Sequence, residues 1–357
     1  RAPVVDLVIG PQAYHHLPKL VAQAEAARAT SRGRAGIVAT DFPAESKFDF
    51  LPEETTATGA SAFLTVQEGC DKFCTFCIVP FTRGRERSRP IESIIKEVED
   101  GVQNGFVEFT LLGQNVNSYK TPDGKFPVLL DRIAQIKGVK RLRFTSPHPK
   151  DVDDHMLEVM VKHDNICNQV HLPLQAGSDR ILKRMNRSYT SSEFLELAKK
   201  IREYMPDCTL TTDVIVGFPG ESEDEFLDTL SVIKKVKFNF AYMFKYSSRP
   251  GTKASQYDEQ IGESVKQDRL ERLIELQLKN TLAQNKSLIG KTVRVLVEKV
   301  SKKSKDQWSG RTEGGMWVIF DRNNEDIGEV VNIRIDDARG VTLFGSRAYQ
   351  EYNYEVA

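Results

Sequence analysis

Three cysteines within eight residues, Cys70, Cys74 and Cys77, form the part of the chain most able to carry chemistry. Thiolates are the protein ligands of iron–sulfur clusters, and a four-iron cluster usually takes four of them. A loop that offers three leaves one iron with an open coordination position, where a substrate or cosubstrate can bind. The spacing C-x3-C-x2-C therefore predicts a catalytic four-iron, four-sulfur (4Fe-4S) cluster.

Other uses of the cysteines fit the sequence less well. A disulfide framework needs an oxidising compartment and a denser set than five cysteines in 357 residues. A structural zinc site, the weaker alternative, asks for a fourth ligand nearby, and the closest histidines are His16 and His148. Ferredoxin-type runs have different spacing, and Cys167 and Cys208 do not lie in ligand-like sequences. We expect those two to be small buried hydrophobic residues.

The composition sets limits on the class of protein. A chain of 357 residues with 40% hydrophobic residues suits two or three globular domains. No run of eighteen apolar residues exists, so we expect no membrane span. Basic and acidic residues balance at 50 each, which restricts any nucleic-acid contact to local patches. Few cysteines, an oxygen-sensitive cluster and no recognisable signal peptide predict a reducing, cytoplasmic location.

Strands must alternate with helices in the middle of the chain to position the cysteine loop. The six apolar stretches that predict strands are 62–66, 106–112, 141–145, 169–174, 209–216 and 240–246. Two helix starts carry capping boxes, Thr190 with Glu193 and Ser222 with Glu225. Six such units predict an open, partial βα barrel with a parallel sheet, because a closed barrel needs eight. Its ligands lie at the carboxyl ends of the strands, where the cysteine loop follows the first strand.

The domain boundaries follow from changes in pattern. A stretch rich in Pro, Glu and Thr over 43–59 indicates a linker that closes a short first segment. A long helix over 263–287 leads to a glycine, after which short alternating strands predict a small β-barrel of about 65 residues. We therefore expect three parts, residues 1–55, 56–288 and 290–353.

Four arginines occupy every second position after the cysteine loop: Arg83, Arg85, Arg87 and Arg89. Such a run is ordinarily a solvated charged segment. Because this one continues the cysteine loop, we favour a role for Arg83, Arg85 and Arg87 in gripping nucleic-acid phosphates, which guanidinium groups bind in a bidentate way.

Polar residues also gather where later strands end. Gln114 and Asn115 follow the second predicted strand, and Gln175 follows the fourth. Asn-rich turns are common for backbone reasons alone, but at this edge the amides could equally bind the amino acid part of a cosubstrate. Asp213 lies within an apolar strand and needs a partner there. Gly217 ends the same strand in a turn that would let the backbone approach an adenine or ribose, although the signal is weak.

We expect His148 and His171, which lie near the same edge, to be structural. The last domain is locally basic, since residues 291–311 hold seven basic and two acidic residues beside Trp308. A basic surface with exposed aromatic rings suits RNA. The alternative is that Trp317 belongs to the core and the lysine run is a solvated hairpin tip, and composition leaves both open.

The cysteine spacing resembles the signature of the radical S-adenosylmethionine (radical SAM) enzymes. Residues 74–86 (CTFCIVPFTRGRE) are similar to the methylthiotransferase family, and residues 112–119 (LGQNVNSY) resemble its tRNA-modifying MiaB branch. The C-terminal domain is similar to TRAM, an RNA-binding β-barrel module. The resemblance covers essentially the whole chain and implies an open βα barrel followed by a TRAM-like barrel. It also favours Lys302, Lys303 and Trp308 as RNA contacts.

The resemblance further implies that Cys70, Cys74 and Cys77 hold a cluster whose open iron chelates the amino and carboxylate groups of S-adenosylmethionine. Reductive cleavage of this cosubstrate would give methionine and a deoxyadenosyl radical. The radical would abstract hydrogen from C2 of an N6-isopentenyladenosine beside the tRNA anticodon, where a methylthio group is inserted. The implied partners are a tRNA anticodon stem-loop and an external electron donor, and we expect a monomer.

The chain departs from the family pattern in one respect. Members carry an auxiliary 4Fe-4S cluster held by three cysteines of an N-terminal domain, whereas this chain begins with Arg1 and has no cysteine before Cys70. We expect residues 1–55 to be a remnant of that domain. The chain should then bind one cluster and cleave S-adenosylmethionine without thiolating RNA.

Other functions remain open at this stage. Two rival targets within the same enzyme class are threonylcarbamoyl-adenosine in tRNA and an aspartate of a ribosomal protein. The turn 114–117 and the run 78–80 favour the isopentenyl branch. A different class, a non-catalytic RNA-binding protein with a structural metal site, predicts a colourless, zinc-containing protein.

Overall fold

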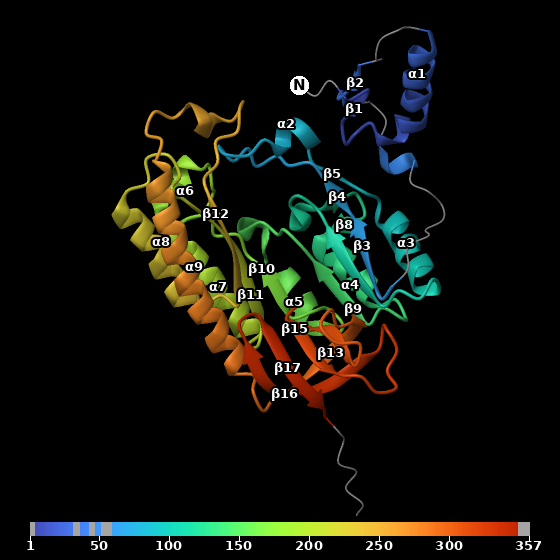
Figure 1. The fold of residues 1–357 in the computed structure, drawn as a ribbon, viewed down its shortest axis with the longest axis vertical. Coiled ribbons are helices and arrows are strands. Elements are labelled where there is room, and N and C mark those ends of the chain that lie inside the picture. Colours follow the sequence, from blue (N-terminus) through green and yellow to red (C-terminus); the bar gives the residue numbers. More distant parts are fainter. Residues whose placement is uncertain (1–3, 31–35, 43–46, 51–58, 349–357) are drawn as a thin grey trace, which may run out of the picture.

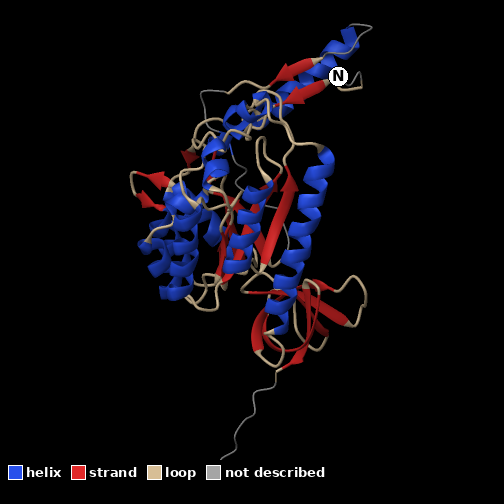
Figure 2. Cartoon of the chain, turned by 90° about the vertical axis from the view of Figure 1, so that its left-hand side faces the viewer, coloured by secondary structure: helices blue, strands red, loops and turns tan. Residues whose placement is uncertain are grey.

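The computed structural model describes residues 4–30, 36–42, 47–50 and 59–348. A small N-terminal segment, an open βα barrel and a closed β-barrel follow one another along the molecule (Figure 1). The side view in Figure 2 has the same order. The predicted boundary near residue 56 and the predicted end at residue 353 lie outside the described residues. The boundary at 288–290 falls between the last long helix and the first strand of the closed barrel.

The N-terminal segment is a small βαβ arrangement. Strands β1 (Leu7–Ile9) and β2 (Ile37–Ala39) pair in parallel, and α1 (Leu17–Thr30) lies between them in the chain. Two short 3-10 turns accompany them, η1 (Tyr14–His16) and η2 (Lys47–Phe50). The side chain of Gln12 donates to the carbonyl of Arg83 at 2.9 Å, so the segment contacts the arginine run of the central barrel.

All six predicted strands of the central barrel are present. They are β3 (Ser61–Thr65), β6 (Glu108–Leu112), β9 (Arg141–Phe144), β10 (Gln169–His171), β11 (Thr209–Val216) and β12 (Phe240–Lys245). The strands are parallel in the orders β3-β6-β9 and β10-β11-β12, and a bridge between Leu142 and Ile166 joins the two sets. Within the described sheets β3 and β12 do not pair with each other, so the barrel is open, as predicted.

Helices cover the outer face of this sheet. They are α3 (Ile91–Gln103), α4 (Phe126–Ala134), α5 (Asp154–Lys162), α6 (Asp179–Arg184), α7 (Ser191–Tyr204), α8 (Glu223–Val236) and α9 (Glu263–Lys286). In α3, Ile91, Ile94 and Val98 recur at helical spacing and are buried against the strands. Both predicted capping boxes form at the starts of α7 and α8. In the described part of the chain, no helix is long and apolar enough to span a bilayer.

Short elements fill the loops of the central barrel. They are β4 (Gln67–Glu68), α2 (Val79–Arg83), β5 (Arg87–Ser88), η3 (Val116–Ser118), β7 (Lys120–Thr121), β8 (Gly124–Lys125), η4 (Pro149–Asp151) and η5 (Lys253–Gln256). Because β4 pairs with β5 in an antiparallel ribbon, the cysteine loop and the first two arginines of the run lie in the connection between two paired strands.

The C-terminal domain is a closed barrel of five strands in the order β13-β14-β15-β17-β16. The strands are β13 (Thr292–Val300), β14 (Gln307–Thr312), β15 (Trp317–Asp321), β16 (Val330–Arg339) and β17 (Thr342–Arg347). Apolar alternation over 293–297, 316–320 and 329–333 predicts β13, β15 and β16. It misses β14 and β17, which are rich in polar residues and glycine. Val295, Trp308, Phe320 and Ile333 are among the side chains that fill its core.

A buried ionic cluster joins the two barrels at the amino ends of the parallel strands. Glu108, which is fully buried, pairs with Arg143 at 2.8 Å and with Arg311 of the small barrel at 2.7 Å. Arg141 donates to the carbonyls of Arg294 and Arg311. Burial by itself raises the pKa of Glu108, but the guanidinium groups of Arg143 and Arg311 outweigh it and lower the pKa overall. The small barrel is thereby fixed across the end of the open barrel opposite the cysteine loop.

A three-cysteine cavity as the candidate active site

The cysteine loop leaves β4 through a tightly constrained turn. Gly69 has φ +81°, and a Cβ there would collide with the carbonyl of Arg85, so this position requires glycine. The buried amide of Gln67 donates to the carbonyl of Gly69 at 2.9 Å and accepts from the backbone N–H of Asn115 at 3.2 Å. Gln67 therefore ties the cysteine loop to the turn that follows β6.

The segment after α6 clasps the middle of the loop. The side-chain amide of Asn186 donates to the carbonyls of Lys72 and Phe73 at 3.1 and 3.0 Å. Thr75 bonds to the carbonyls of Arg184 and Met185 through its hydroxyl and its N–H. These contacts hold a backbone that is strained at Phe73, where φ is +48°.

Cys70, Cys74 and Cys77 line one cavity of about 200 Å³ at the carboxyl ends of the strands. Each sulfur receives an N–H donor. Asn115 Nδ2 donates to Cys70 at 3.3 Å, Arg187 Nη1 to Cys74 at 3.3 Å, and the backbone N–H of Val79 to Cys77 at 3.5 Å. Hydrogen bonds of this kind stabilise thiolates and tune the potential of a cluster bound to them.

The state of the thiols fits ligation rather than disulfide formation. All five cysteines are unpaired, and Cys167 and Cys208 are buried as predicted. Burial raises the pKa of Cys70 and of Cys77, so their protons leave when a metal binds. Among the described residues, no three His, Cys, Asp or Glu side chains could together hold a metal ion. A cubane cluster does not need three side chains that converge on one metal ion, because each thiolate binds its own iron.

Four of the five predicted cofactor residues share this cavity with the cysteines: Gln114, Asn115, Gln175 and Asp213. Gln114 Oε1 accepts from the N–H of Gly69 at 2.7 Å, which anchors the start of the loop. Gln175 adopts φ +68° and bonds to β11 through its backbone. Asp213 has the partner that its position demanded, because His171 Nε2 lies 3.2 Å from its Oδ2.

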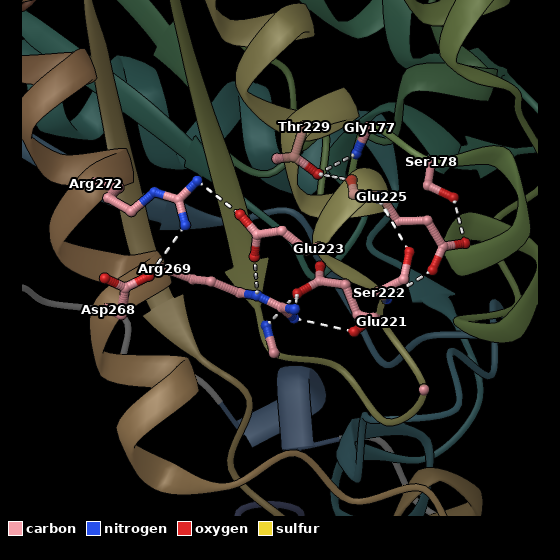
Figure 3. Close-up of polar contacts among 12 residues, drawn as sticks. Gly177, Ser178, Glu221, Ser222, Glu223, Glu225, Thr229, Asp268, Arg269 and Arg272 are labelled. Carbon is pink, nitrogen blue, oxygen red and sulfur yellow. Dashed lines mark hydrogen bonds and ion pairs between the residues drawn. The ribbon is translucent and has the colours of Figure 1, made fainter.

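Gly217 does not join this group. Its N–H donates to Glu221 Oε2 at 2.7 Å, and Glu221 pairs with Arg269 of α9 at 2.8 Å (Figure 3). Burial raises the pKa of Glu221 to about 7. The Gly217 turn is thus fastened to α9, outside the wall of the cysteine cavity.

The same network orders the loop after β10. Glu225 accepts from Ser178 at 3.0 Å, and Thr229 Oγ1 accepts from the N–H of Gly177 at 2.8 Å (Figure 3). Glu225 also pairs with Arg180. Arg180 is the main cause of the low pKa of Glu225, about 2. Gln175, two residues before Gly177, is therefore carried on a loop that α8 holds in place.

The two histidines differ from each other. His148 also lines the cysteine cavity, but it is buried, and its Nδ1 accepts from the N–H of Lys150. His171 is only half-buried, lines the cysteine cavity and pairs with Asp213. The prediction of a purely structural role for His171 is therefore incomplete. Its contact with Asp213 depends on how neighbouring strands pack, which the sequence does not show.

In the arginine run, Arg83 and Arg89 are at least partly buried in ion pairs, whereas Arg85 and Arg87 are exposed. Arg83 pairs with the buried Glu68 at 2.9 Å, which weakens its assignment to phosphate. Arg85 is 80% exposed and pairs with Asp71 at 2.8 Å, a contact that is worth little in water. Arg87 is exposed on β5, and Arg89 is buried against Glu97.

In the small barrel, the tryptophan expected at the surface is buried, and the one that could belong to the core is only half-buried. Trp308 is 5% exposed, and its Nε1 donates to Glu325 at 3.2 Å within the core. This burial contradicts its predicted stacking on RNA. Trp317 is half-buried and faces the interior of the open barrel, with Lys299 Nζ 4.3 Å from its ring centroid. Lys302 and Lys303 lie exposed between β13 and β14, where a phosphate could reach them.

Sequence reasoning missed three residues that shape the site: Gln67, Asn186 and Arg187. Each contacts a segment far away in the chain. A single polar residue inside or after an apolar element does not predict which distant segment it contacts. Gln67 offered the clearest signal, since it is a polar residue directly after an apolar strand.

The chain matches two family models. Residues 64–233 match the radical SAM superfamily, and residues 286–347 match the TRAM domain. Domains of the radical SAM superfamily bind a 4Fe-4S cluster and S-adenosylmethionine. The fold and the three-cysteine cavity accordingly define a radical SAM enzyme with a C-terminal TRAM domain.

Curated relatives narrow the class. The tRNA-2-methylthio-N(6)-dimethylallyladenosine synthase of Bacteroides thetaiotaomicron is 46% identical over 347 residues, which cover 96% of this chain and 75% of that protein. The protein of the same name from Porphyromonas gingivalis is 44% identical over 346 residues, covering 96% and 73%. The chain belongs to the tRNA-2-methylthio-N(6)-dimethylallyladenosine synthase family.

Solved structures with similarity to the chain are more distant. A radical S-adenosylmethionine methyltransferase from Kitasatospora setae has a TM-score of 0.47 at 16% identity, over 55% of this chain and 39% of that one. Coproporphyrinogen III oxidase from Escherichia coli has a TM-score of 0.45 at 13% identity, over 71% and 67%.

Proposed function

We propose that this chain carries the radical-generating and RNA-binding parts of a tRNA methylthiotransferase that acts at C2 of N6-isopentenyladenosine beside the anticodon. The observation that carries the proposal is the cavity lined by three thiols, each with its own N–H donor, and by neither of the two other cysteines. The names of the relatives support the substrate, because their dimethylallyl group is the isopentenyl group.

In this proposal Cys70, Cys74 and Cys77 hold the cluster. A reduced cluster supplies the electron that cleaves S-adenosylmethionine. The protein steadies the thiolates through Asn115, Arg187 and the N–H of Val79. Asn115 Nδ2 also donates to Glu86 at 2.8 Å, so its amide nitrogen positions Cys70 and its Oδ1 is left for the cosubstrate.

The remaining polar groups of the cavity would orient the cosubstrate. Asp213 offers a carboxylate to an ammonium group, and Gln114 and Gln175 offer amides to the rest of the amino acid part. The contacts of Gly217 support a role in fixing α9 more than the cofactor contact first expected of it.

The RNA surface would have two parts. Arg85 and Arg87 lie on the rim near the cysteine loop, and Lys302 and Lys303 extend from the small barrel. The exposed ion pair of Arg85 with Asp71 can exchange for a phosphate at little cost. The partners in this proposal are a tRNA anticodon stem-loop and an external electron donor, and the enzyme acts as a monomer.

The source of the inserted sulfur is a separate matter. The first cysteine of the chain is Cys70, so residues 1–69 offer no thiolate to an auxiliary cluster. We infer that the chain as printed binds one cluster and cleaves S-adenosylmethionine without thiolating RNA.

Nucleoside analysis of tRNA tests the proposed function. In a strain that lacks the gene, 2-methylthio-isopentenyladenosine should be replaced by isopentenyladenosine, and the reintroduced gene should restore it. The same gene carrying Cys74→Ala should not, whereas Cys208→Ala should. Persistence of the methylthio nucleoside in the deletion strain would refute the proposal, and loss of a methylthiolated threonylcarbamoyl nucleoside would point to the rival target.

A further inference from the structure

A second and larger cavity lies inside the open barrel, next to the cysteine cavity. Its volume is about 700 Å³, within the range of small-molecule sites. Ser146, His171 and Asp213 line both cavities, so the two spaces adjoin. A group held in the larger cavity can therefore present an atom to the cysteine end.

Aromatic side chains from the two edge strands of the open barrel, β3 and β12, line this larger cavity. Phe63 of β3 is 67% exposed, and Phe240 and Tyr242 of β12 are 38% and 52% exposed. Their neighbours Leu64 and Ala241 are buried, as expected on the opposite face of each strand. Large rings left open to water inside a barrel mark a surface that a ligand covers.

The small barrel supplies one end of the same cavity. Met316 and Trp317, at the start of β15, are among its lining residues together with Gly314 and Gly315. The ring of Trp317 lies against Lys299, at 4.3 Å, and Arg311, at 5.6 Å, which orient it. A domain matched to an RNA-binding module thus contributes an aromatic surface to the interior of the catalytic barrel.

The charges that line the cavity are already paired. Arg143 is engaged by Glu108, and Arg311 by Glu108 and Glu298 at 2.7 and 2.6 Å. His171 faces Asp213. Among the described lining residues, no cation is left for a ligand carboxylate, and an apolar group finds four phenyl or phenol rings and an indole.

We infer that this aromatic cavity receives the N6 substituent of the target adenosine, and that Trp317 and Phe63 determine the preference for an apolar isopentenyl group over a threonylcarbamoyl group. The inference rests on the proposed function and extends it to named specificity residues. The threonylcarbamoyl group carries a carboxylate, which would be buried here without a partner. The isopentenyl group is apolar and gains contact area with the rings.

Binding of three anticodon stem-loop RNAs to the anaerobically reconstituted chain tests the inference. The RNAs carry isopentenyladenosine, threonylcarbamoyl-adenosine or unmodified adenosine at the same position. The wild-type chain should bind the isopentenyl RNA most tightly. Trp317→Ala and Phe63→Ala should each reduce the preference over unmodified RNA by about tenfold and leave the affinity for unmodified RNA unchanged.

Matched variants separate this effect from loss of structure. Phe344→Ala removes another half-buried ring of the small barrel, stacked under Arg339 and outside the cavity lining, and should keep the wild-type preference. Trp317→Phe keeps a ring in place and should retain most of it. If Trp317→Ala does not fold, Phe63→Ala and Trp317→Phe still decide the matter.

The outcomes distinguish the inference from the proposed function. Equal weakening of all three RNAs by Trp317→Ala and Phe63→Ala, or unchanged preference in both, would overturn the inference alone. A wild-type chain that binds isopentenyl and unmodified RNA equally would overturn it as well, whatever the nucleoside analysis gives. Tightest binding of the threonylcarbamoyl RNA would contradict both.

Discussion

Arg187 donates from Nη1 to the sulfur of Cys74 at 3.3 Å and from Nε to the hydroxyl of Tyr189 at 3.0 Å. Its guanidinium carbon also lies 5.1 Å from the centroid of the Tyr189 ring. Within the described chain, no carboxylate forms an ion pair with Arg187. Its positive charge is therefore directed at the thiol that occupies the middle of the cysteine motif, and it reaches this position from a segment 113 residues further along the chain.

Loss of this charge should lower the reduction potential of the bound cluster. A nearby cation and hydrogen bonds to the ligand sulfurs stabilise an added electron. Arg187→Met should therefore shift the reduction potential to more negative values by tens of millivolts, on the order of a few per cent of the range that such clusters span. Arg187→Lys keeps the charge and should shift it less. Potentiometric titration followed by absorbance measures both, and an unchanged or raised potential in Arg187→Met would argue against this role.

His148 should make the protein sensitive to mild acid. Burial, followed by the charges of Arg187 and Lys72, lowers the pKa of His148 from 6.5 to about 3. The folded state keeps the imidazole neutral, whereas the unfolded chain binds a proton below pH 6.5. The free energy of unfolding that His148 contributes is therefore complete above pH 6.5 and is lost as the pH falls toward 3.

Replacement of His148 by Asn keeps an acceptor for the Lys150 N–H but removes the titration. Compared with wild type, His148→Asn should lose about 2 kcal/mol less stability between about pH 7 and about pH 5. Urea unfolding at the two pH values gives the difference, and His155→Asn, at an exposed histidine, serves as the control. An acid response identical to wild type in His148→Asn would be inconsistent with a buried neutral imidazole.

Glu108 should be a main determinant of stability at the junction of the two barrels. Glu108→Leu leaves Arg143 and Arg311 without their shared carboxylate, and removal of one partner of a buried pair costs about 3–5 kcal/mol. The exposed pair of Glu92 with Arg132 provides the comparison, since Glu92→Gln should leave the free energy of unfolding nearly unchanged. Denaturant unfolding of the two variants should differ accordingly, and equal small losses would show that the junction adds little.

The lysines and the tryptophan of the small barrel should affect different properties. Lys302→Ala and Lys303→Ala should each weaken tRNA binding across sequences and reduce its salt slope by about 1, with stability unchanged. Trp308→Ala should instead destabilise the fold by about 3–5 kcal/mol because it empties the core. Salt-dependent binding and thermal unfolding separate the two effects. A Trp308→Phe variant with normal stability but much weaker RNA binding would restore the stacking role.

The sequence predicts the parts of the fold that depend on local pattern. The six parallel strands, the two capping boxes and the long α9 all follow from periodicity and cap residues close together in the chain. In the small barrel β14 escapes prediction, since its residues 307–312 (QWSGRT) include five with small or polar side chains. With that strand missed, the direction in which Trp308 points could not be derived.

The same distinction between local patterns and distant contacts applies to the site. The cysteine spacing predicts the proposed cluster ligands because the three thiols belong to one loop, and Asp213 stands out by its polarity inside an apolar strand. The contacts of Arg187 with Cys74 and of Trp317 with the interior of the open barrel depend on the packing of elements more than a hundred residues from the parts they serve. Such distant contacts are determined by the tertiary structure and leave no local pattern.

The number of irons bound per chain tests the central claim most directly. After anaerobic reconstitution, the chain should hold about four irons, show an absorbance shoulder that dithionite bleaches, and cleave S-adenosylmethionine. Cys74→Ala should abolish the absorbance and the cleavage, and Cys167→Ala should leave both intact. A colourless protein containing zinc, or about eight irons in the wild-type chain, would contradict a single catalytic cluster held by Cys70, Cys74 and Cys77.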